Sequence, residues 1–193
     1  MLYTRKGDSG TTKDFKSGSG ERTSKSSCQN ESLGALDELN SFLGLVKVKS
    51  ATVTWTVRGN ITGKISVQSP CDTIHWIQNC LFSVQAEVAG ADKKISKGEV
   101  TKMESIIDAM EADMPPIKTF FISGGSELAA LFDISRTLAR TAERRLIAAV
   151  TAGEIILAPA TLAFINRLSS LMYALARYSN HTAGIIEQPP TYQ

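Results

Sequence analysis

The chain has 193 residues, of which 42% are hydrophobic and 21% are charged. This composition is typical of a globular domain and excludes a disordered, collagenous or disulfide-rich chain. Its 21 lysine and arginine residues against 19 aspartate and glutamate residues leave a net charge of +2, which gives no general electrostatic reason to expect a nucleic acid or an anionic membrane as a partner. The chain opens without an apolar h-region, and no apolar run approaches the ~18 residues of a membrane-spanning helix. We expect a cytoplasmic protein with no membrane partner, and residues 1–193 are long enough for one domain with a sizeable core or at most two small ones.

The cysteine and histidine residues give no sign of a disulfide framework or a metal site. The three cysteines, Cys28, Cys71 and Cys80, are odd in number and form no C-x-x-C pair, so we expect reduced thiols. His75 and His181 lie far apart in the sequence and form no zinc-ligand pattern. No metal site made by the chain's own residues is therefore expected.

The first half of the chain predicts an arm, a helix and a small hairpin. Residues 1–30 are rich in glycine, serine, threonine and lysine and predict a flexible arm. A helix is expected over 31–49, where apolar residues recur at three- and four-residue steps. Residues 52–67 alternate β-branched or aromatic residues with polar ones around Arg58-Gly59-Asn60, which predicts a β-hairpin turning at that point. Because an isolated ribbon is weak in water, this insertion should lean on the helices or on another subunit.

The second half of the chain predicts four more helices. Helical spacing runs from Ile74 to Val88, with Asp72 or Thr73 as the expected N-cap. A capping box at 96–99 opens a helix that two prolines at 115–116 end.

A long helix is expected at 126–152 after Gly124-Gly125, and Pro159 begins a last one at 159–180. The tail from Ile185 is expected to be frayed. Five helices with mostly short links, without alternating strands, predict an all-α antiparallel bundle of the ferritin-like kind with a β-hairpin insertion.

Polar residues gather on one face of the helix at 126–152. This face carries Arg136, Arg140, Glu143 and Arg144, opposite a stripe of leucine and alanine. Arginine suits bidentate recognition of phosphate or carboxylate, although a solvated surface with an intrahelical pair explains the same pattern. The last helix has a similar polar side that begins at Asn166, and the first helix carries Asp37.

Residues 4–12, with the sequence TRKGDSGTT, concentrate groups that suit an anion. Glycine lets main-chain N–H groups converge on an anion, and the hydroxyl groups add further donors. Asp8 could hold a hydrated Mg²⁺ or orient the loop. The segment lacks the Gly-Lys-Ser/Thr ending of a P-loop, and a plain linker is the alternative.

Five segments together resemble the PduO-type ATP:cob(I)alamin (corrinoid) adenosyltransferase family. Residues 4–12 resemble its TR-x-GD-x-GTT opening, and residues 34–41 (GALDELNS) its G-x-x-DELNS helix. Residues 120–125 (FFISGG) are similar to its F-I-L-P-G-G turn. Residues 136–145 (RTLARTAERR) and 165–169 (INRLS) resemble its AR-x-x-x-R-x-AERR and INRLS helices. These matches occur in family order over nearly the whole chain.

The resemblance implies a single corrinoid adenosyltransferase domain that assembles as a homotrimer, with active sites between subunits. It implies that cob(I)alamin attacks the 5′-carbon of Mg-ATP and gives adenosylcobalamin and triphosphate. The substrates would be ATP with Mg²⁺ and cob(I)alamin or a related corrinoid. A corrinoid reductase is an implied partner, and an adenosylcobalamin-dependent enzyme is a further candidate partner.

The resemblance also implies roles for individual residues. The arm, residues 1–30, would bind the nucleotide, with the phosphates held by Thr4, Arg5, Gly7, Asp8, Gly10, Thr11, Thr12 and Lys25. The helices would hold ATP through Arg140, Glu143, Arg144 and Asn166. Asp37 and Arg136 match a pair that bridges subunits beside the corrinoid. Phe120 matches an aromatic residue that helps displace the lower base of the corrinoid.

The chain departs from the family pattern mainly on the corrinoid side. Asp133 and Ser135 stand where the family usually has His and Ala, Ser123 replaces a Pro, Thr141 an Arg and Ser170 an Asp. Asp133 lies one turn before Arg136 and is expected to compete with Asp37 for it, which could shift the preference toward an incomplete corrinoid. Two alternatives remain: a non-catalytic sensor or escort that binds ATP or adenosylcobalamin, and a structural bundle with a disordered basic arm.

Overall fold

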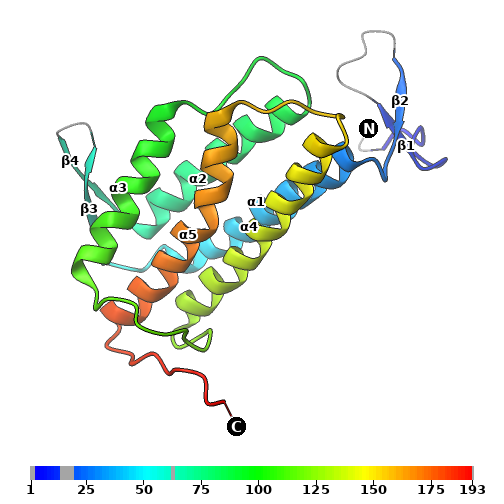
Figure 1. The fold of residues 1–193 in the computed structure, drawn as a ribbon. Helices are drawn as coiled ribbons and strands as arrows, with labels where there is room; N and C mark the ends of the chain where they lie inside the picture. The colour runs from blue at the N-terminus through cyan, green and yellow to red at the C-terminus, as the bar shows by residue number, and fades with distance from the viewer. Residues whose placement is uncertain (1–2, 14–19, 62–63, 193) are drawn as a thin grey trace.

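The structure, a computed structural model, describes residues 3–13, 20–61 and 64–192. Over these residues the chain forms the predicted all-α bundle of five helices (Figure 1): α1 Cys28–Ser50, α2 Pro70–Val88, α3 Lys97–Asp113, α4 Glu127–Thr151 and α5 Pro159–Thr182. Two antiparallel ribbons accompany it, made of the strands β1 Thr11–Lys13 and β2 Arg22–Ser24, and β3 Val57–Ile61 and β4 Lys64–Gln68. None of the helices in this described part is both long and apolar enough to cross a bilayer.

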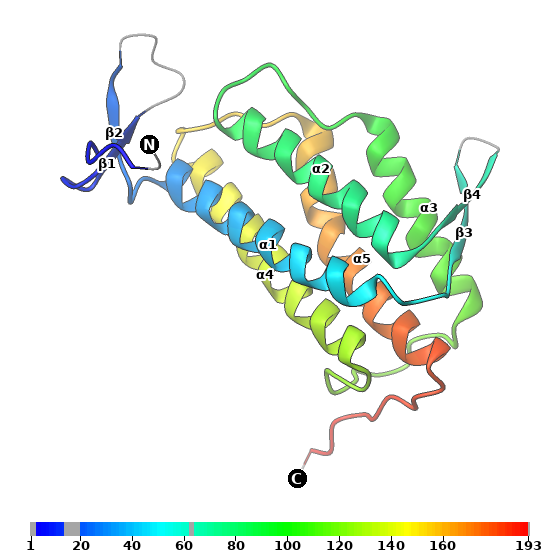
Figure 2. The same ribbon diagram turned by 180° about the vertical axis from the view of Figure 1, so that it is seen from behind.

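Helix α4 lies between α1 and α5 and packs against both, while α3 packs on α5 and α2 on α1 (Figures 1 and 2). The pairing of α1 with α4 is antiparallel, because ion pairs join opposite ends of the two helices. Glu31 near the start of α1 pairs with Arg145 at 3.5 Å, and Lys49 at its end pairs with Glu127 at 2.7 Å. The apolar side chains between the helices form one continuous core.

Four of the helices begin at a serine N-cap. Ser27, Ser69, Ser96 and Ser126 each accept a hydrogen bond from the backbone N–H three residues later, which satisfies a donor that the first turn leaves free. Helix α1 therefore starts at Cys28, earlier than the predicted residue 31. The predicted cap of α2 at Asp72 or Thr73 is wrong, because Ser69 followed by Pro70 begins the helix a turn earlier.

At the N-termini of α5 and α1, backbone N–H groups donate hydrogen bonds to carboxylates from other parts of the chain. Buried Glu87 of α2 accepts hydrogen bonds from Ala158 N–H at 2.7 Å and from the Thr161 hydroxyl at 2.5 Å. Glu154, after α4, accepts from the N–H groups of Cys28 and Gln29 at 3.3 and 2.7 Å. A negative charge is favourable at a helix N-terminus, so these contacts join the helix ends at one end of the bundle.

The inserted hairpin exists, but its turn lies further along the chain than predicted. Gly59 and Asn60 are inside β3, where they pair with Ser66 and Ile65. The predicted turn at these residues is therefore wrong. The chain reverses between Ile61 and Lys64, and the two residues between them lie outside the described part.

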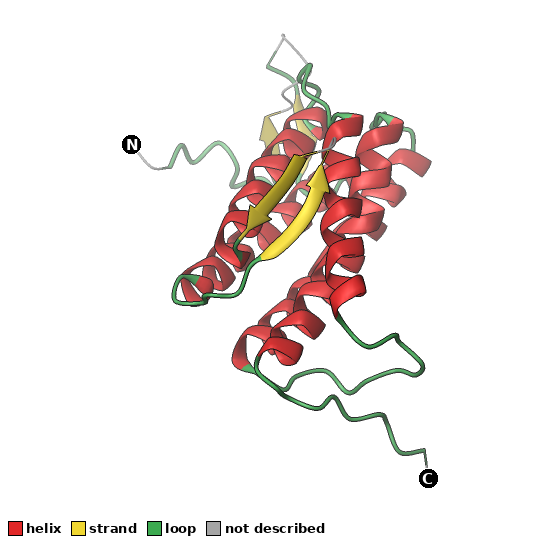
Figure 3. Cartoon of the chain, turned by 90° about the vertical axis from the view of Figure 1, so that its left-hand side faces the viewer, coloured by secondary structure: helices red, strands yellow, loops and turns green. Residues whose placement is uncertain are grey.

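The hairpin leans on the helices of its own chain. Residues 52–56, predicted as part of the first strand, form no strand. Instead Trp55 packs edge-on against Tyr178 of α5, with ring centroids 5.0 Å apart. Strand β3 lies against α3, and Figure 3 shows the ribbon on the outside of the bundle.

The N-terminal arm contains a second ribbon that the sequence did not predict. Thr11 pairs with Ser24 and Lys13 with Arg22. The ribbon is attached to α1 by the Asn30 side chain, which donates to the Thr23 hydroxyl at 3.0 Å and to the Ser24 carbonyl at 2.6 Å. Figures 1 and 2 show it projecting beyond the end of the bundle.

The start of the C-terminal tail is docked, so the prediction of a frayed tail from Ile185 is wrong for this part. Glu187 pairs with Arg177 at 2.9 Å, and the Gln188 carbonyl accepts the N–H of Ile122 at 2.9 Å. The tail therefore contacts both α5 and the loop before α4.

The cysteines give a test of the packing between α2 and α3. All three are free, Cys28 and Cys71 are half-buried and Cys80 is buried. Burial, and next the nearby Glu99 carboxylate, raise the pKa of Cys80 to about 12. Because the thiolate is the nucleophile, we expect iodoacetamide at about pH 8 to alkylate Cys28 and Cys71 and to spare Cys80, as measured by peptide mass spectrometry.

The control is the same reaction in urea, where all three thiols should be alkylated. Equal alkylation rates of Cys80 and Cys28 in the folded protein would contradict this packing.

Candidate functional site

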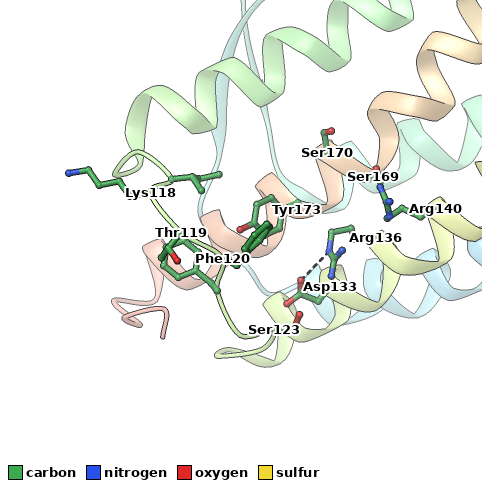
Figure 4. A pocket seen from close by; sticks show the side chains of 12 residues that line it. Lys118, Thr119, Phe120, Ser123, Asp133, Arg136, Arg140, Ser169, Ser170 and Tyr173 are labelled. Carbon is green, nitrogen blue, oxygen red and sulfur yellow. Dashed lines mark ion pairs between the residues drawn. The ribbon is translucent and has the colours of Figure 1, made fainter. Parts of the chain in front are cut away.

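A pocket of about 600 Å³ lies where the loop before α4 meets α4 and α5 (Figure 4). The loop, α4 and α5 contribute Ile117, Lys118, Thr119, Phe120, Phe121, Ser123, Asp133, Arg136, Arg140, Ser169, Ser170 and Tyr173. Three sequence-predicted residues, Phe120, Arg136 and Arg140, thus share one pocket.

Asp133 joins the pocket's arginine to the turn that precedes α4. One carboxylate oxygen lies 3.5 Å from Arg136 Nε, and the other accepts the N–H of Gly124 at 3.0 Å. The predicted pairing of Asp133 with Arg136 is therefore confirmed. Asp37, the competing acid, is exposed on α1.

The two glycines of the turn are required by geometry. Gly124 and Gly125 have φ of +115° and +106°, a region that other residues rarely adopt. A Cβ at Gly125 would lie 2.4 Å from the Asn180 side-chain oxygen. Asn180 donates to the Gly124 carbonyl at 2.8 Å and accepts from Ser126 N–H at 2.9 Å, so it fixes the turn from both sides. No sequence motif singled out Asn180.

Aromatic side chains from the loop and from α5 line the pocket. Phe120 is 79% exposed, so its ring contributes little to the core and is free to contact a ligand. Tyr173 is half-buried, and burial raises the pKa of its hydroxyl. Figure 4 shows Tyr173 between the loop residues and the two arginines. Its position on the polar side of the last helix was visible in the sequence, although no role was assigned to it.

The polar row of α4 continues beyond the pocket. Arg140 and Arg144 are exposed, and Arg144 donates to the Thr141 hydroxyl at 3.1 Å. Glu143 accepts a hydrogen bond from Asn166 of α5 at 2.8 Å. These residues form a charged strip across α4 and α5 that begins in the pocket.

The segment 4–12 folds as a loop before and into β1. The Asp8 N–H faces the Arg5 carbonyl at 3.4 Å, and the Gly10 N–H donates to the Gly7 carbonyl at 3.1 Å. Gly10 has φ of +77° and Arg5 has φ of +57°. Positive φ is uncommon for arginine, and such residues concentrate at functional sites. Thr4 and Asp8 are exposed, and Thr11 and Thr12 are half-buried.

Two cationic residues, one in β2 and one directly after it, contact this loop. Arg22 donates to the hydroxyl and carbonyl oxygens of Thr11 at 2.8 and 2.7 Å, and also to the Lys6 carbonyl. Lys25 lies over the loop, since a Cβ added at Gly7 would be 3.0 Å from its Nζ. Arg22 was not assigned to the site, although it stands in the same Arg22-Thr23-Ser24-Lys25 segment as Lys25.

Within one chain, the loop over residues 4–12 lies apart from the pocket. The ribbon that carries the loop projects beyond the end of the bundle where α1 begins (Figures 1 and 2). Because α1 and α4 are antiparallel, α4 ends near this point, and Arg140 lies roughly 16 Å back along the helix axis from Thr151. The candidate site residues therefore form two separate groups within a single subunit.

Comparison with known proteins gives consistent matches. The sequence model of the family described as cobalamin adenosyltransferase matches residues 2–179. The chain is 36% identical to the corrinoid adenosyltransferase of Bacillus subtilis over 188 residues, which cover 95% of this chain and 89% of that protein. It is also 36% identical to the corrinoid adenosyltransferase PduO of Citrobacter freundii, covering 94% of this chain and 50% of the relative's length.

A solved structure is similar over nearly the whole chain. It is a variant of the PduO-type ATP:corrinoid adenosyltransferase from Lactobacillus reuteri in complex with cobalamin and ATP. The TM-score is 0.83 at 26% identity, and the alignment covers 98% of this chain and 96% of that one.

The geometry at Asp133 predicts the effect of neutralising its charge. Asp133→Asn keeps the shape of the side chain but weakens both the ion pair with Arg136 and the hydrogen bond from Gly124. We expect the free energy of unfolding to fall by about 1–2 kcal/mol, as for loss of a charge-assisted hydrogen bond, measured by urea denaturation. Asp108→Asn, at an exposed position on α3, is the matched control. A loss no larger than that of the control would refute the bridging role.

Proposed function

The chain belongs to the cobalamin adenosyltransferase family and is thus a transferase, and we propose that it transfers the 5′-deoxyadenosyl group of ATP to the Co(I) of cobalamin or a related corrinoid. The cobalt electron pair forms a bond to the 5′-carbon of ATP, the bond from this carbon to oxygen breaks, and triphosphate leaves. The observation that supports this most is the pocket with an exposed aromatic ring on one side and a row of arginines on the other. Apolar and cationic walls suit a macrocycle held beside a polyanion.

The charged strip on α4 and α5 is the proposed ATP site on the bundle. Arg140 and Arg144 present guanidinium groups to the triphosphate, and the Glu143–Asn166 contact leaves further polar atoms for the nucleoside. The leaving triphosphate takes up negative charge in the transition state, and fixed cations stabilise it there. Displacement in line with the leaving oxygen is then mainly a problem of positioning.

The loop over residues 4–12 is proposed to close over the phosphates. Thr4, Arg5, Gly7, Gly10, Thr11, Thr12 and Lys25 would supply N–H, hydroxyl and ammonium donors. Asp8 is exposed and would hold the hydrated Mg²⁺ that accompanies ATP. Arg22 holds the loop to β1 and β2, so it would act by shaping the loop.

Phe120, Arg136 and Asp37 form the proposed corrinoid side. Phe120 would press on the corrinoid and help remove its lower base. Arg136 would be shared between Asp37 of a neighbouring subunit and Asp133 of its own helix, 3.5 Å away. Since Asp133 already engages Arg136, we propose that the corrinoid preference is shifted toward an incomplete corrinoid.

The loop over residues 4–12 and the pocket lie apart within one chain, which supports a homotrimer with sites between subunits. Exposed apolar residues on α1 and α4, among them Leu45, Val48, Ile134 and Ile147, give these neighbouring helices a surface that another copy could cover. We place the enzyme in the cytoplasm, with a corrinoid reductase as the supplier of Co(I). An adenosylcobalamin-dependent enzyme would accept the product.

A non-catalytic sensor or escort is the second candidate, because Arg136 on the proposed corrinoid side is already paired with Asp133. Incubation with ATP, Mg²⁺ and chemically reduced cobalamin distinguishes the two. Growth of the adenosylcobalamin spectrum with release of triphosphate supports the enzyme. Tight binding of both ligands without turnover supports the sensor.

Arg140→Ala tests the assignment of the ATP site. Alanine favours the helix, so we expect an unchanged circular dichroism spectrum and a loss of kcat/KM for ATP of roughly 100-fold or more, as for loss of a transition-state charge contact. Arg136→Ala is the paired variant and should impair corrinoid use or assembly instead. Turnover at the wild-type level in Arg140→Ala, or an effect of Arg136→Ala on the KM for ATP alone, would show that this division of α4 is wrong.

Mixing two inactive variants tests whether the site lies between subunits. Arg5→Ala disables the loop and Arg140→Ala disables the helix, so each homotrimer should be inactive. After co-refolding at equal amounts, about one quarter of the sites should combine an intact loop with an intact helix, because each of two independent choices is right half of the time. The measurement is adenosylcobalamin formation by the mixture. Absence of recovery, with assembly checked by light scattering, would mean that loop and helix act within one chain.

A further inference from the structure

The loop that carries Phe120 is held by groups that lie outside the pocket. Residues 117–123 form neither helix nor strand, and Asp133 and Asn180 fix only the glycine turn that follows them. The segment before the turn needs other contacts to keep a defined position over the pocket.

Arg177 of α5 provides some of these contacts. Its side chain is 7% exposed, and its guanidinium lies 5.2 Å from the centre of the Phe121 ring. It also donates to the Pro115 carbonyl at 3.3 Å. Arg177 thus contacts the chain on both sides of Phe120.

The C-terminal tail provides further contacts. Glu187 accepts a hydrogen bond from Arg177 Nε at 2.9 Å. One residue later, the Gln188 carbonyl accepts the N–H of Ile122 at 2.9 Å. Residues 185–188 therefore run beside the loop and are bonded to it both directly and through Arg177.

Ile185 of the tail is half-buried, and polar contacts attach the two residues that follow Ile186. Ile186 is 81% exposed, and a cavity of about 450 Å³ is lined by Ile185, Ile186 and Glu187 of the tail together with Met114, Phe121 and His181. Removing one partner of an enclosed ion pair leaves the other charge unpaired and costs stability locally. The Arg177–Glu187 pair is thus the charged contact that supports the attachment of the tail, beside the hydrogen bond from Ile122 to Gln188.

We propose that residues 185–188 form a strap that sets the position of the Phe120 loop, with Arg177 and Glu187 as positioning residues for corrinoid binding. The proposal deepens the proposed function and rests on it for its kinetic consequence. The structural part, that the strap holds the loop, stands independently of any activity.

Hydrogen exchange in the substrate-free protein tests the structural part. Glu187→Gln removes the charge while keeping the side-chain shape, and we expect the Ile122 amide to exchange roughly fivefold faster, because local opening becomes easier. Gln188→Ala is the matched control, since it keeps the carbonyl that accepts the Ile122 N–H. An Ile122 amide that exchanges as in wild type in Glu187→Gln would overturn the strap.

Steady-state kinetics test the link to the corrinoid. In Glu187→Gln we expect the corrinoid KM to rise roughly tenfold with the ATP KM unchanged, because a positioning error of about 1 Å can cost up to about 100-fold. Faster exchange at Ile122 with unchanged corrinoid kinetics would overturn the positioning role. Faster exchange together with a wild-type protein that makes no adenosylcobalamin would support the strap and refute the proposed function instead.

Discussion

The antiparallel packing of α1 against α4 determines where every candidate site residue lies. Two ion pairs, Glu31–Arg145 and Lys49–Glu127, join the helices at opposite ends, and the buried leucines of α1 belong to the apolar core that the five helices share. Surface ion pairs contribute little free energy, so the apolar core supplies the stability and the ion pairs match the register that it sets. In this register the N-terminal arm leaves the bundle where α4 ends, and the pocket opens toward the start of α4.

This arrangement separates two chemistries that the proposed reaction must join. The arm offers main-chain donors, hydroxyls and the cations Arg22 and Lys25 around a tight loop, while α4 offers Arg136 and Arg140 beside aromatic rings. An association between copies would resolve the separation if the loop of one copy reached the helix of the next. The exposed apolar residues of α1 and α4 fit such an association. A neighbouring copy that covered them would also lie close to the arginines of α4.

Local patterns in the sequence predicted most of the fold. Three- and four-residue spacing gave all five helices, and the glycine pair before α4 gave the turn that its positive φ angles require. The start of α2 was missed because Asp72, Thr73 and Ser69 are all good caps, and only the adjoining Pro70 favours the earlier one. The turn of the inserted hairpin was misplaced because Gly59-Asn60 is a turn signal that strand pairing overrides.

The residues of the candidate site could be predicted from the sequence only in part, for a different reason. Arg136, Arg140 and Phe120 belong to motifs, and the residue type itself suggests their chemistry. Asn180, Tyr173, Arg177 and Glu187 act through contacts between segments far apart in the chain. Long-range contacts leave no period or short motif in the sequence, so only the packed structure reveals them.

The strap and Asp133 act on the same element from opposite ends. Asp133 holds the Gly124 N–H, and the tail holds the Ile122 N–H two residues earlier. Between these two points the backbone has little freedom, whereas Phe120 lies outside them and remains exposed. A bulky ligand can therefore contact the exposed ring while the turn behind it stays in place. The hydrogen bond from Gly124 also holds the Asp133 carboxylate beside Arg136. The loop side and the arginine side of the pocket are therefore connected through the Asp133 carboxylate.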